Sequence, residues 1–191
     1  TKGPEYRIKT FHCEQIFLND GDEFTFTTED IIGDNTRVSV TYADLPSQLK
    51  QGDRVLIDDG RLELTVKELT DTDVICTVVT GGPVTNRKGV NIPGVHLSMP
   101  FISEKDRNDI LFAIREGFDF IAASFTRNAD DILQMRQILK DNGGAGVNII
   151  AKIENMEGVE NIDEILRVVD GVMVARGDLG VEVPLEEVPS L

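Results

Sequence analysis

The stretch Val147–Glu154, which reads VNIIAKIE, decides the fold, because it is an apolar run that ends in a lysine and a glutamate. A largely apolar run of this length is typical of a parallel strand covered on both faces. Phe118–Phe125 before it and Gly171–Ala175 after it have the same character. Helical patterns lie between the runs, so the sequence predicts repeated βα units with parallel strands. Either an α/β barrel or an open doubly wound sheet has this alternation.

Helix signals support these units. Ser103–Asp106 is a capping box, in which the serine side chain accepts from the backbone three residues on, and the helix it starts ends at Gly117. Asn128 caps a second helix that closes near Asn142, and a third is predicted around Gly158–Val169.

The first half of the chain has a β texture. Asp59-Gly60 predicts a hairpin turn, because glycine readily takes the positive φ that such turns need. Short alternating runs predict a small barrel or sandwich. The predicted strands are Tyr6–Thr10, Glu23–Thr27, Arg37–Thr41, Arg54–Ile57, Leu62–Glu68 and Val74–Thr80.

The charge balance limits the partners. A net charge of −15 argues against nucleic acid, whose phosphates attract basic surfaces. Charged residues interrupt every apolar run, so no membrane span is predicted. Cys13 and Cys76 lack metal-ligand spacing, and a metal pair of His12 with Cys13 is disfavoured. A cytoplasmic enzyme of small charged metabolites fits this composition.

Polar residues follow the three apolar runs of the second half. They are Ser124, the pair Lys152 and Glu154, and Arg176–Asp178. The carboxyl ends of parallel strands form the ligand face, and residues two apart on a strand point the same way. A lysine and two carboxylates there predict an Mg²⁺ or Mn²⁺ site beside a phosphoryl-binding cation. The plainer alternative is that Lys152 and Glu154 only pair with each other and that Asp178 is a helix cap.

Basic residues flank the β-rich half. Arg7, Arg87 and Lys88 stand near its ends and could clamp phosphates, although ordinary surface charge is the alternative for each.

The order of these motifs resembles the pyruvate kinases over the whole chain, and Phe120–Phe125 resembles the bacterial branch. The motifs that carry the resemblance are Thr1–Glu5, Asp58–Gly60, Lys88–Gly94, Ser103–Asp106, Ser124–Phe125, Lys152–Asn155, Glu157–Val159 and Met173–Glu182.

The resemblance implies an α/β fold: part of a (β/α)₈ TIM barrel with an inserted all-β barrel lid domain. On this basis residues 1–4 are a hinge from the barrel, 5–86 the lid and 87–191 part of the catalytic domain. The implied reaction transfers a phosphoryl group from phosphoenolpyruvate to ADP and gives pyruvate and ATP. It implies Mg²⁺ or Mn²⁺, K⁺, a cytoplasmic homotetrameric parent, and neither nucleic acid nor membrane as partner.

The resemblance also implies roles for the strand-end residues. Lys152 is similar to the catalytic lysine that stabilises the transferring phosphoryl group, and Glu154 and Asp178 to the divalent-metal ligands. Arg176, Gly177 and Asp178 would hold the substrate, together with Ser124.

Four further roles follow from the resemblance. Arg7 and Lys88 resemble nucleotide-phosphate contacts, Asp59 resembles a lid residue that closes on the site, and Thr1 matches a K⁺ ligand through its carbonyl.

Parts of the family pattern are not in these 191 residues. The Arg-x-Asn-x-Ser-His and Ala-Thr-Gln segments are absent, and Val188–Leu191 looks like a helix that has just begun. We therefore expect an internal piece that is inactive alone. The alternatives are an isolated non-catalytic lid or binding module, and another barrel enzyme that uses phosphoenolpyruvate.

Overall fold

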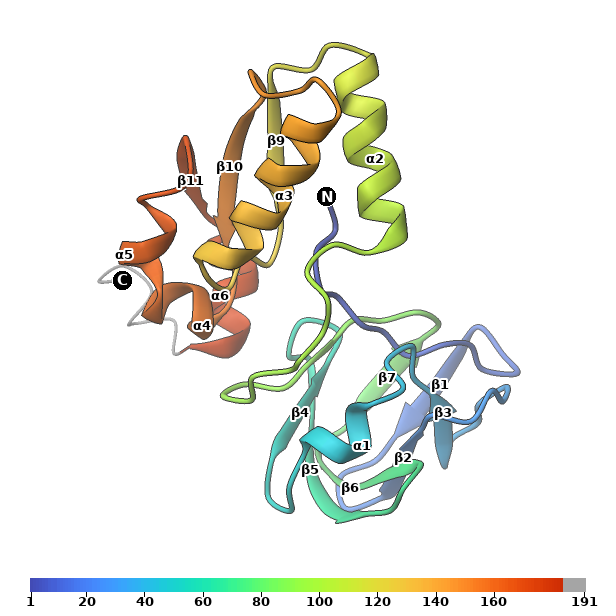
Figure 1. The fold of residues 1–191 in the computed structure, drawn as a ribbon. Helices are drawn as coiled ribbons and strands as arrows, with labels where there is room; N and C mark the ends of the chain where they lie inside the picture. The colour runs from blue at the N-terminus through green and yellow to red at the C-terminus, as the bar shows by residue number, and fades with distance from the viewer. Residues whose placement is uncertain (184–191) are drawn as a thin grey trace. The chain divides into compact units, whose positions relative to one another are not determined.

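The computed structural model describes residues 1–183, so the expected helix start at Val188–Leu191 lies outside the described residues. The chain divides into two compact units (Figure 1). One unit consists of Thr1–Glu5 and Ser98–Leu191, and the other of Tyr6–Leu97. No helix within residues 1–183 combines the length and the apolar character needed to cross a membrane.

The unit Tyr6–Leu97 is built of β-strands. A six-stranded sheet has the order β3-β2-β6-β5-β4-β8, and β1 pairs antiparallel with β7. The elements are β1 (Gln15–Leu18), β2 (Glu23–Thr27), β3 (Arg37–Ser39), α1 (Leu45–Gln48), β4 (Arg54–Ile57), β5 (Leu62–Leu69), β6 (Asp73–Thr80), β7 (Gly82–Thr85) and β8 (Val90–Asn91).

Alternation along the strands builds the core of this unit. Phe24 and Phe26, two apart on β2, are both buried and meet edge to face with ring centroids 5.5 Å apart. Cys76 on the adjacent β6 is fully buried among them, and this burial raises the pKa of its thiol to about 12. Cys13, in contrast, is exposed.

The sequence predicted five of these strands and misjudged four segments, one of which is the two-residue β8 that was not predicted. Tyr6–Thr10 is not a regular strand, since only isolated bridges form there, from Arg7 to Gly89 and from Ile8 to Val40. Strands β1 and β7 were missed because they pair only with each other. Neither has the usual alternation of a strand, since the apolar Phe17 of β1 is 58% exposed and β7 begins with Gly-Pro, which is unusual in strands.

The boundaries of the β unit also differ from the expected range 5–86. The unit ends at Leu97 because β8 pairs antiparallel with β4, and because the amide of Ile8 donates to the carbonyl of Lys88. These bonds tie residues 87–91 to the β sheet.

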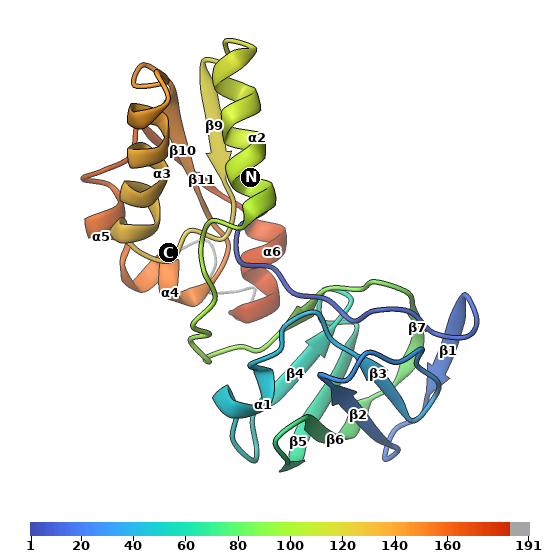
Figure 2. The same cartoon turned by 45° about the vertical axis from the view of Figure 1, so that its right-hand side comes forward.

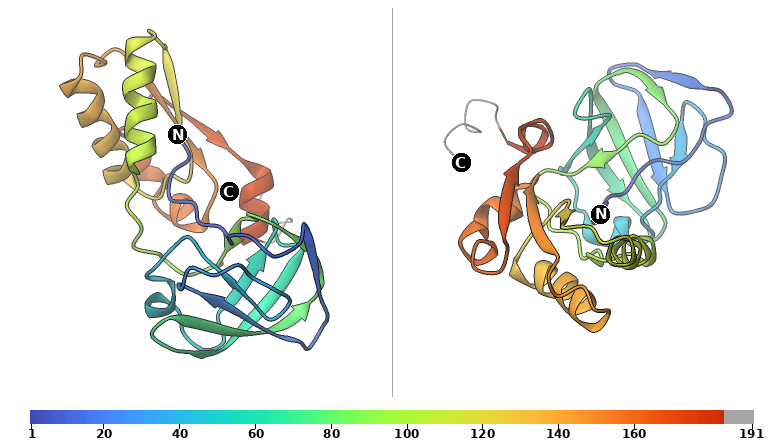
Figure 3. Two further views of the ribbon diagram at one scale, coloured as in Figure 1. Left: turned by 90° about the vertical axis from the view of Figure 1, so that its right-hand side faces the viewer. Right: turned by 90° about the horizontal axis from the view of Figure 1, so that it is seen from above.

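The other unit alternates strands and helices. Three parallel strands lie in the order β11-β10-β9, with β10 in the centre (Figures 2 and 3). The elements are α2 (Glu104–Arg115), β9 (Phe120–Ala123), α3 (Ala129–Asp141), β10 (Asn148–Ile153), α4 (Met156–Glu160), α5 (Ile162–Ile165), β11 (Gly171–Val174) and α6 (Arg176–Glu182). Parallel strands with helices after them are the arrangement of a segment of an α/β barrel.

The predicted helix starts are confirmed. Ser103 and Asp106 form a reciprocal capping box on α2, and the Asn128 side chain accepts from the amide of Asp131 on α3. The single helix expected around Gly158–Val169 is wrong, because the backbone leaves the helical conformation at Asn161 and divides it into α4 and α5.

Only one face of the parallel sheet is covered within residues 1–183. Ile121, Ile149 and Ile153 point to that face and pack in one core with Ile132 and other helix residues. On the opposite face Phe120 is 60% exposed. The expectation of strands covered on both faces is therefore not met by the described residues, which place no layer over Phe120.

We predict that the two thiols differ sharply in reactivity. At pH 8 native protein should be alkylated by iodoacetamide at exposed Cys13, while Cys76 stays unlabelled, because burial blocks access and its raised pKa keeps it protonated. Peptide mass spectrometry measures both sites, and labelling in denaturant serves as the control, where both should react. Equal labelling rates in the native protein would contradict this burial.

Candidate active site

The residues predicted to bind the metal and the phosphoryl group lie at one edge of the parallel sheet. Ala123 pairs with Ala151, and Ile153 pairs with Val174, so β9, β10 and β11 end together. Three polar segments therefore follow at the same edge (Figure 1): 124–125, 152–154 and 176–178. This is the edge at which parallel α/β folds bind ligands.

Glu154 is the centre of the arrangement. Its side chain is 1% exposed, and one carboxylate oxygen forms an ion pair with the Lys152 ammonium. The other oxygen accepts the backbone N–H of Phe125 at 2.7 Å. Lys152 also donates to the Ser124 hydroxyl at 3.2 Å, and its side chain is 22% exposed. The strand positions thus bring Ser124, Lys152 and Glu154 into one cluster. The pairing of Lys152 with Glu154, which the sequence analysis gave as an alternative, is part of this cluster.

The loop after β9 is shaped to present the Phe125 amide. Phe125 has φ 54°, a left-handed conformation that is uncommon for residues other than glycine. The Thr126 hydroxyl donates to the Ala123 carbonyl at 3.0 Å and closes the turn. The loop packs on α4, where a Cβ added to Gly158 would lie 2.5 Å from the Thr126 carbonyl oxygen. Close packing therefore holds this backbone in place beside Glu154.

An ion pair missed in the sequence braces the same loop. The Arg127 guanidinium bonds both carboxylate oxygens of Asp131, at 3.0 and 2.9 Å, and also the Met99 carbonyl at 2.9 Å. Asn161 donates to the Arg127 carbonyl at 3.0 Å, which joins the loop to the break between α4 and α5. An Arg–Asp spacing of four at a helix start was the available signal.

Arg176, Gly177 and Asp178 form the first turn of α6. The amide of Ala175 donates to the Ile153 carbonyl at 3.1 Å, so this turn begins beside the residue preceding Glu154. All three residues are exposed, and a Cβ on Gly177 would meet nothing within 4 Å. Within residues 1–183 no hydrogen bond or ion pair links Asp178 to the Lys152–Glu154 cluster.

The donor chemistry fits a hard divalent cation. Within residues 1–183 no three His, Cys, Asp or Glu side chains are placed so that they could hold a metal ion by themselves. Mg²⁺ is usually held by one or two carboxylates, completed by water and substrate phosphate oxygens. Two carboxylates lie at this edge, Glu154 directly after β10 and Asp178 in the first turn of α6 after β11.

Thr1 lies alongside the end of β9. Its nitrogen donates to the Ala122 carbonyl at 2.8 Å, and its hydroxyl reaches the same oxygen at 3.4 Å. Two residues on, Gly3 has φ +68°, and an added Cβ would lie 2.1 Å from the Ser124 carbonyl oxygen. The segment therefore passes directly against the residue that contacts Lys152.

The predicted nucleotide contacts gather within the β unit. Lys88 forms an ion pair with Asp58 at 2.8 Å, and Arg7 donates to the Arg87 carbonyl at 2.8 Å. Asp58, Asp59 and Arg87 have φ of 54°, 57° and 60°. Asp59 is exposed at the tip of the β4–β5 hairpin. The structure thus brings Arg7 and Lys88 onto neighbouring segments of one surface.

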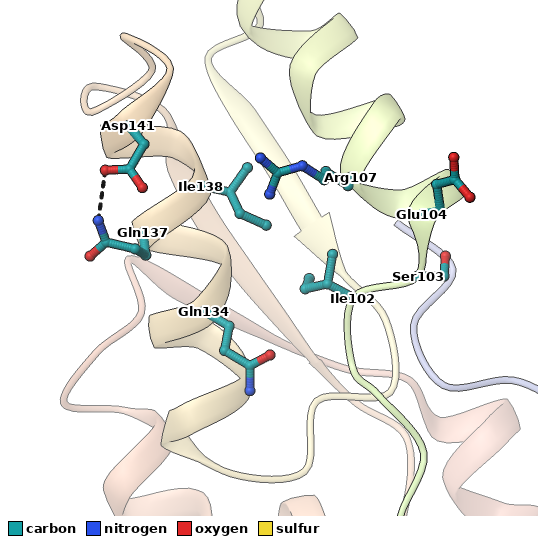
Figure 4. Close-up of a pocket in the computed structure, with 8 residues that line it drawn as sticks. All are labelled: Ile102, Ser103, Glu104, Arg107, Gln134, Gln137, Ile138 and Asp141. Atoms are coloured by element: carbon teal, nitrogen blue, oxygen red, sulfur yellow. Dashed lines mark hydrogen bonds between the residues drawn. The ribbon is translucent and has the colours of Figure 1, made fainter.

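A shallow groove of about 490 Å³ lies away from the strand ends, between α2 and α3 (Figure 4). Arg107 points across it toward Ile138, and Gln137 donates to Asp141 at 2.7 Å. It shares no residue with the Lys152–Glu154 cluster and is not part of the candidate active site.

The comparisons with known proteins agree on one family. The family profile described as "Pyruvate kinase, barrel domain" matches residues 1–191. The chain is 50% identical to a pyruvate kinase of Clostridium perfringens over 98% of its own length and 40% of that protein. It is 49% identical to the Geobacillus stearothermophilus pyruvate kinase, over 99% of this chain and 32% of the relative.

A solved structure gives the same result. The crystal structure of a pyruvate kinase from Cryptosporidium parvum superposes with a TM-score of 0.93 at 40% identity, over 100% of this chain and 40% of that chain. The chain thus spans less than half the length of these relatives, and the expected α/β barrel fold is confirmed.

We predict that Gly158→Ala destabilises the α/β unit by about 1–3 kcal/mol. The added methyl meets backbone at Thr126, and this cost outweighs the roughly 1 kcal/mol that alanine gains over glycine in a helix. Gly146→Ala is the matched control, since its Cβ would meet nothing within 4 Å. Urea unfolding measures both, and equal midpoints for the two variants would refute the packing argument.

Proposed function

The chain belongs to the pyruvate kinase family, and we propose that it carries the phosphoryl-transfer half of the active site of a longer enzyme. The proposed reaction moves the phosphoryl group of phosphoenolpyruvate to ADP and gives pyruvate and ATP. The observation that supports it best is the cluster of Lys152, Ser124 and buried Glu154 at the carboxyl edge of the sheet.

The activity is assigned to the longer protein. The chain spans 40% of the clostridial relative, so the remaining catalytic groups are expected from the rest of the barrel. We propose residues 1–4 as the hinge, the β unit as the lid, and the α/β unit as part of the catalytic domain. The parent is proposed to be a cytoplasmic homotetramer.

Lys152 is proposed as the catalytic cation. A transferring phosphoryl group spreads negative charge over three oxygens, and catalysis depends on donors already aimed at that charge. The ammonium has three N–H donors, of which Ser124 and Glu154 engage two. The third is left for a phosphoryl oxygen. Because the side chain is only 22% exposed, its charge is less screened than it would be in water.

Glu154 and Asp178 are proposed to hold the divalent cation. Bound there, Mg²⁺ or Mn²⁺ would neutralise charge on the phosphoryl and enolate oxygens. The carboxylate of Glu154 is fixed before any ligand arrives, since both its oxygens already have partners. Asp178 is exposed at the same edge and free to orient toward an incoming cation.

The remaining site residues are proposed from the family. The amides of Arg176–Asp178, with Ser124, would hold the substrate carboxylate. Arg7 and Lys88 would contact the nucleotide phosphates, and Asp59 would close over them with the lid. Thr1 would contribute its carbonyl to K⁺.

We predict that Lys152→Met in the full-length enzyme lowers kcat by about 10²–10³-fold and changes the phosphoenolpyruvate KM by less than about threefold. The reason is that the ammonium acts on charge that develops only during transfer. Lys140→Met, an exposed lysine on α3, is the control and should leave both constants unchanged. Steady-state pyruvate formation measures this, and a loss confined to KM would remove Lys152 from its proposed role.

We predict that Glu154→Gln weakens Mn²⁺ binding by tenfold or more, because the amide keeps the shape and loses the charge. The measurement is Mn²⁺ titration of the full-length enzyme followed by electron paramagnetic resonance. Glu160→Gln, exposed at the end of α4, is the control for net charge. Unchanged affinity in Glu154→Gln would exclude Glu154 as a ligand.

A further inference from the structure

A second buried carboxylate, Asp106 on α2, joins segments that are distant in the sequence. Asp106 is only 1% exposed. Oδ2 accepts the Ser103 hydroxyl at 2.7 Å and the Ser103 amide at 3.4 Å, which completes the capping box. Oδ1 accepts the backbone N–H of Lys2 at 2.7 Å. The helix cap therefore uses only Oδ2 of Asp106. Oδ1 holds the segment around Lys2, which is not part of the cap.

The held segment is confined on its other side by β9. Thr1 bonds the Ala122 carbonyl, and Gly3 lies against the Ser124 carbonyl, too close for any Cβ. Thr1–Gly3 thus runs between the start of α2 and the end of β9. Figure 4 shows this segment passing beside Ser103. The bond from the Lys2 N–H to Asp106 fixes the Thr1–Lys2 peptide plane between these two contacts.

That peptide plane carries the Thr1 carbonyl. No cis peptide bond occurs within residues 1–183, and in a trans peptide the C=O and N–H point in opposite directions. Anchoring the Lys2 N–H on Asp106 therefore aims the Thr1 carbonyl away from α2. A charged acceptor also polarises the peptide and makes its carbonyl oxygen more negative.

The Thr1 carbonyl is available to a cation. It accepts no hydrogen bond from residues 1–183, whereas the neighbouring Ala122 carbonyl accepts from Thr1 itself. An oriented, polarised and unpartnered carbonyl is the kind of oxygen that replaces water around K⁺.

We propose that Asp106 is a positioning residue for the monovalent cation: it sets the direction and polarity of the Thr1 carbonyl through the Lys2 amide. This inference rests on the proposed function, in which that carbonyl is a K⁺ ligand. It gives the Ser103–Asp106 capping box a second task besides starting α2.

Two variants separate the two tasks. Asp106→Glu keeps a preferred capping box, Ser-x-x-Glu, but its extra methylene displaces the oxygen that holds Lys2. Ser103→Ala does the reverse: it removes the hydroxyl cap and leaves the bond from Lys2 to Asp106 in place.

The test is titration of the full-length enzyme with Tl⁺, a spectroscopic substitute for K⁺, followed by ²⁰⁵Tl NMR, together with urea unfolding. We expect Asp106→Glu to weaken Tl⁺ binding by about tenfold, the order of one lost ligand contact. Ser103→Ala should lower the unfolding midpoint and leave Tl⁺ affinity unchanged. Asp109→Asn, an exposed carboxylate one turn along α2, controls for charge and should change neither.

Three results would overturn the proposal. Wild-type affinity in Asp106→Glu would show that the carboxylate does not act through Thr1. An equal loss of affinity in Ser103→Ala would reduce Asp106 to a helix cap. Absence of saturable Tl⁺ binding in the wild-type enzyme would remove the K⁺ site itself, and the phosphoryl-transfer assignment would then still stand on Lys152 and Glu154.

Discussion

The α/β unit depends on how it accommodates the buried carboxylate of Glu154. A carboxylate that is 1% exposed is costly unless both its oxygens are satisfied. Lys152 satisfies one from the same strand, because the two residues are two apart and share a face. The Phe125 amide satisfies the other from the end of β9. The ends of β9 and β10 must therefore stay in register, since a shift of one residue between them would leave one oxygen of Glu154 without the Phe125 amide.

Backbone strain accompanies this requirement. Within residues 1–183 the non-glycine residues with positive φ are Asp58, Asp59, Arg87 and Phe125, and each adjoins a proposed functional group. Phe125 aims an amide at Glu154, and Asp58 and Arg87 bond Lys88 and Arg7 in the β unit. Such conformations cost about 1–3 kcal/mol each and persist where the surroundings determine them. At Phe125 the surroundings are the Thr126 turn, the close packing of Gly158 and the Arg127–Asp131 pair.

The sequence was sufficient for features that depend on local spacing. Residues two apart on a strand gave the shared direction of Lys152 and Glu154, and a Ser-x-x-Asp pattern gave the start of α2. Features that depend on contacts between distant segments could not be predicted from it. The left-handed Phe125 follows from packing against α4, and the bond from Lys2 to Asp106 joins residues 104 apart. Strands β1 and β7 were missed for the same reason, because each is defined only by its partner.

The buried carboxylates suggest why the site is built from charges rather than from apolar contacts. Asp106, Asp131 and Glu154 are each at most 2% exposed, and each has partners for both oxygens. Asp106 and Glu154 connect segments that are far apart in the chain, whereas Asp131 pairs with Arg127 four residues before it. Apolar side chains could often join such segments at a lower desolvation cost. A carboxylate does something that they cannot, because it fixes the direction of a particular N–H group. At Glu154, Lys152 and the Phe125 amide fix the direction of the carboxylate itself. At Asp106, the bond from the Lys2 N–H fixes the direction of the Thr1 carbonyl in the same peptide. If these oxygen atoms hold cations as proposed, burying the two charges fixes the geometry of the metal ligands before the ions bind.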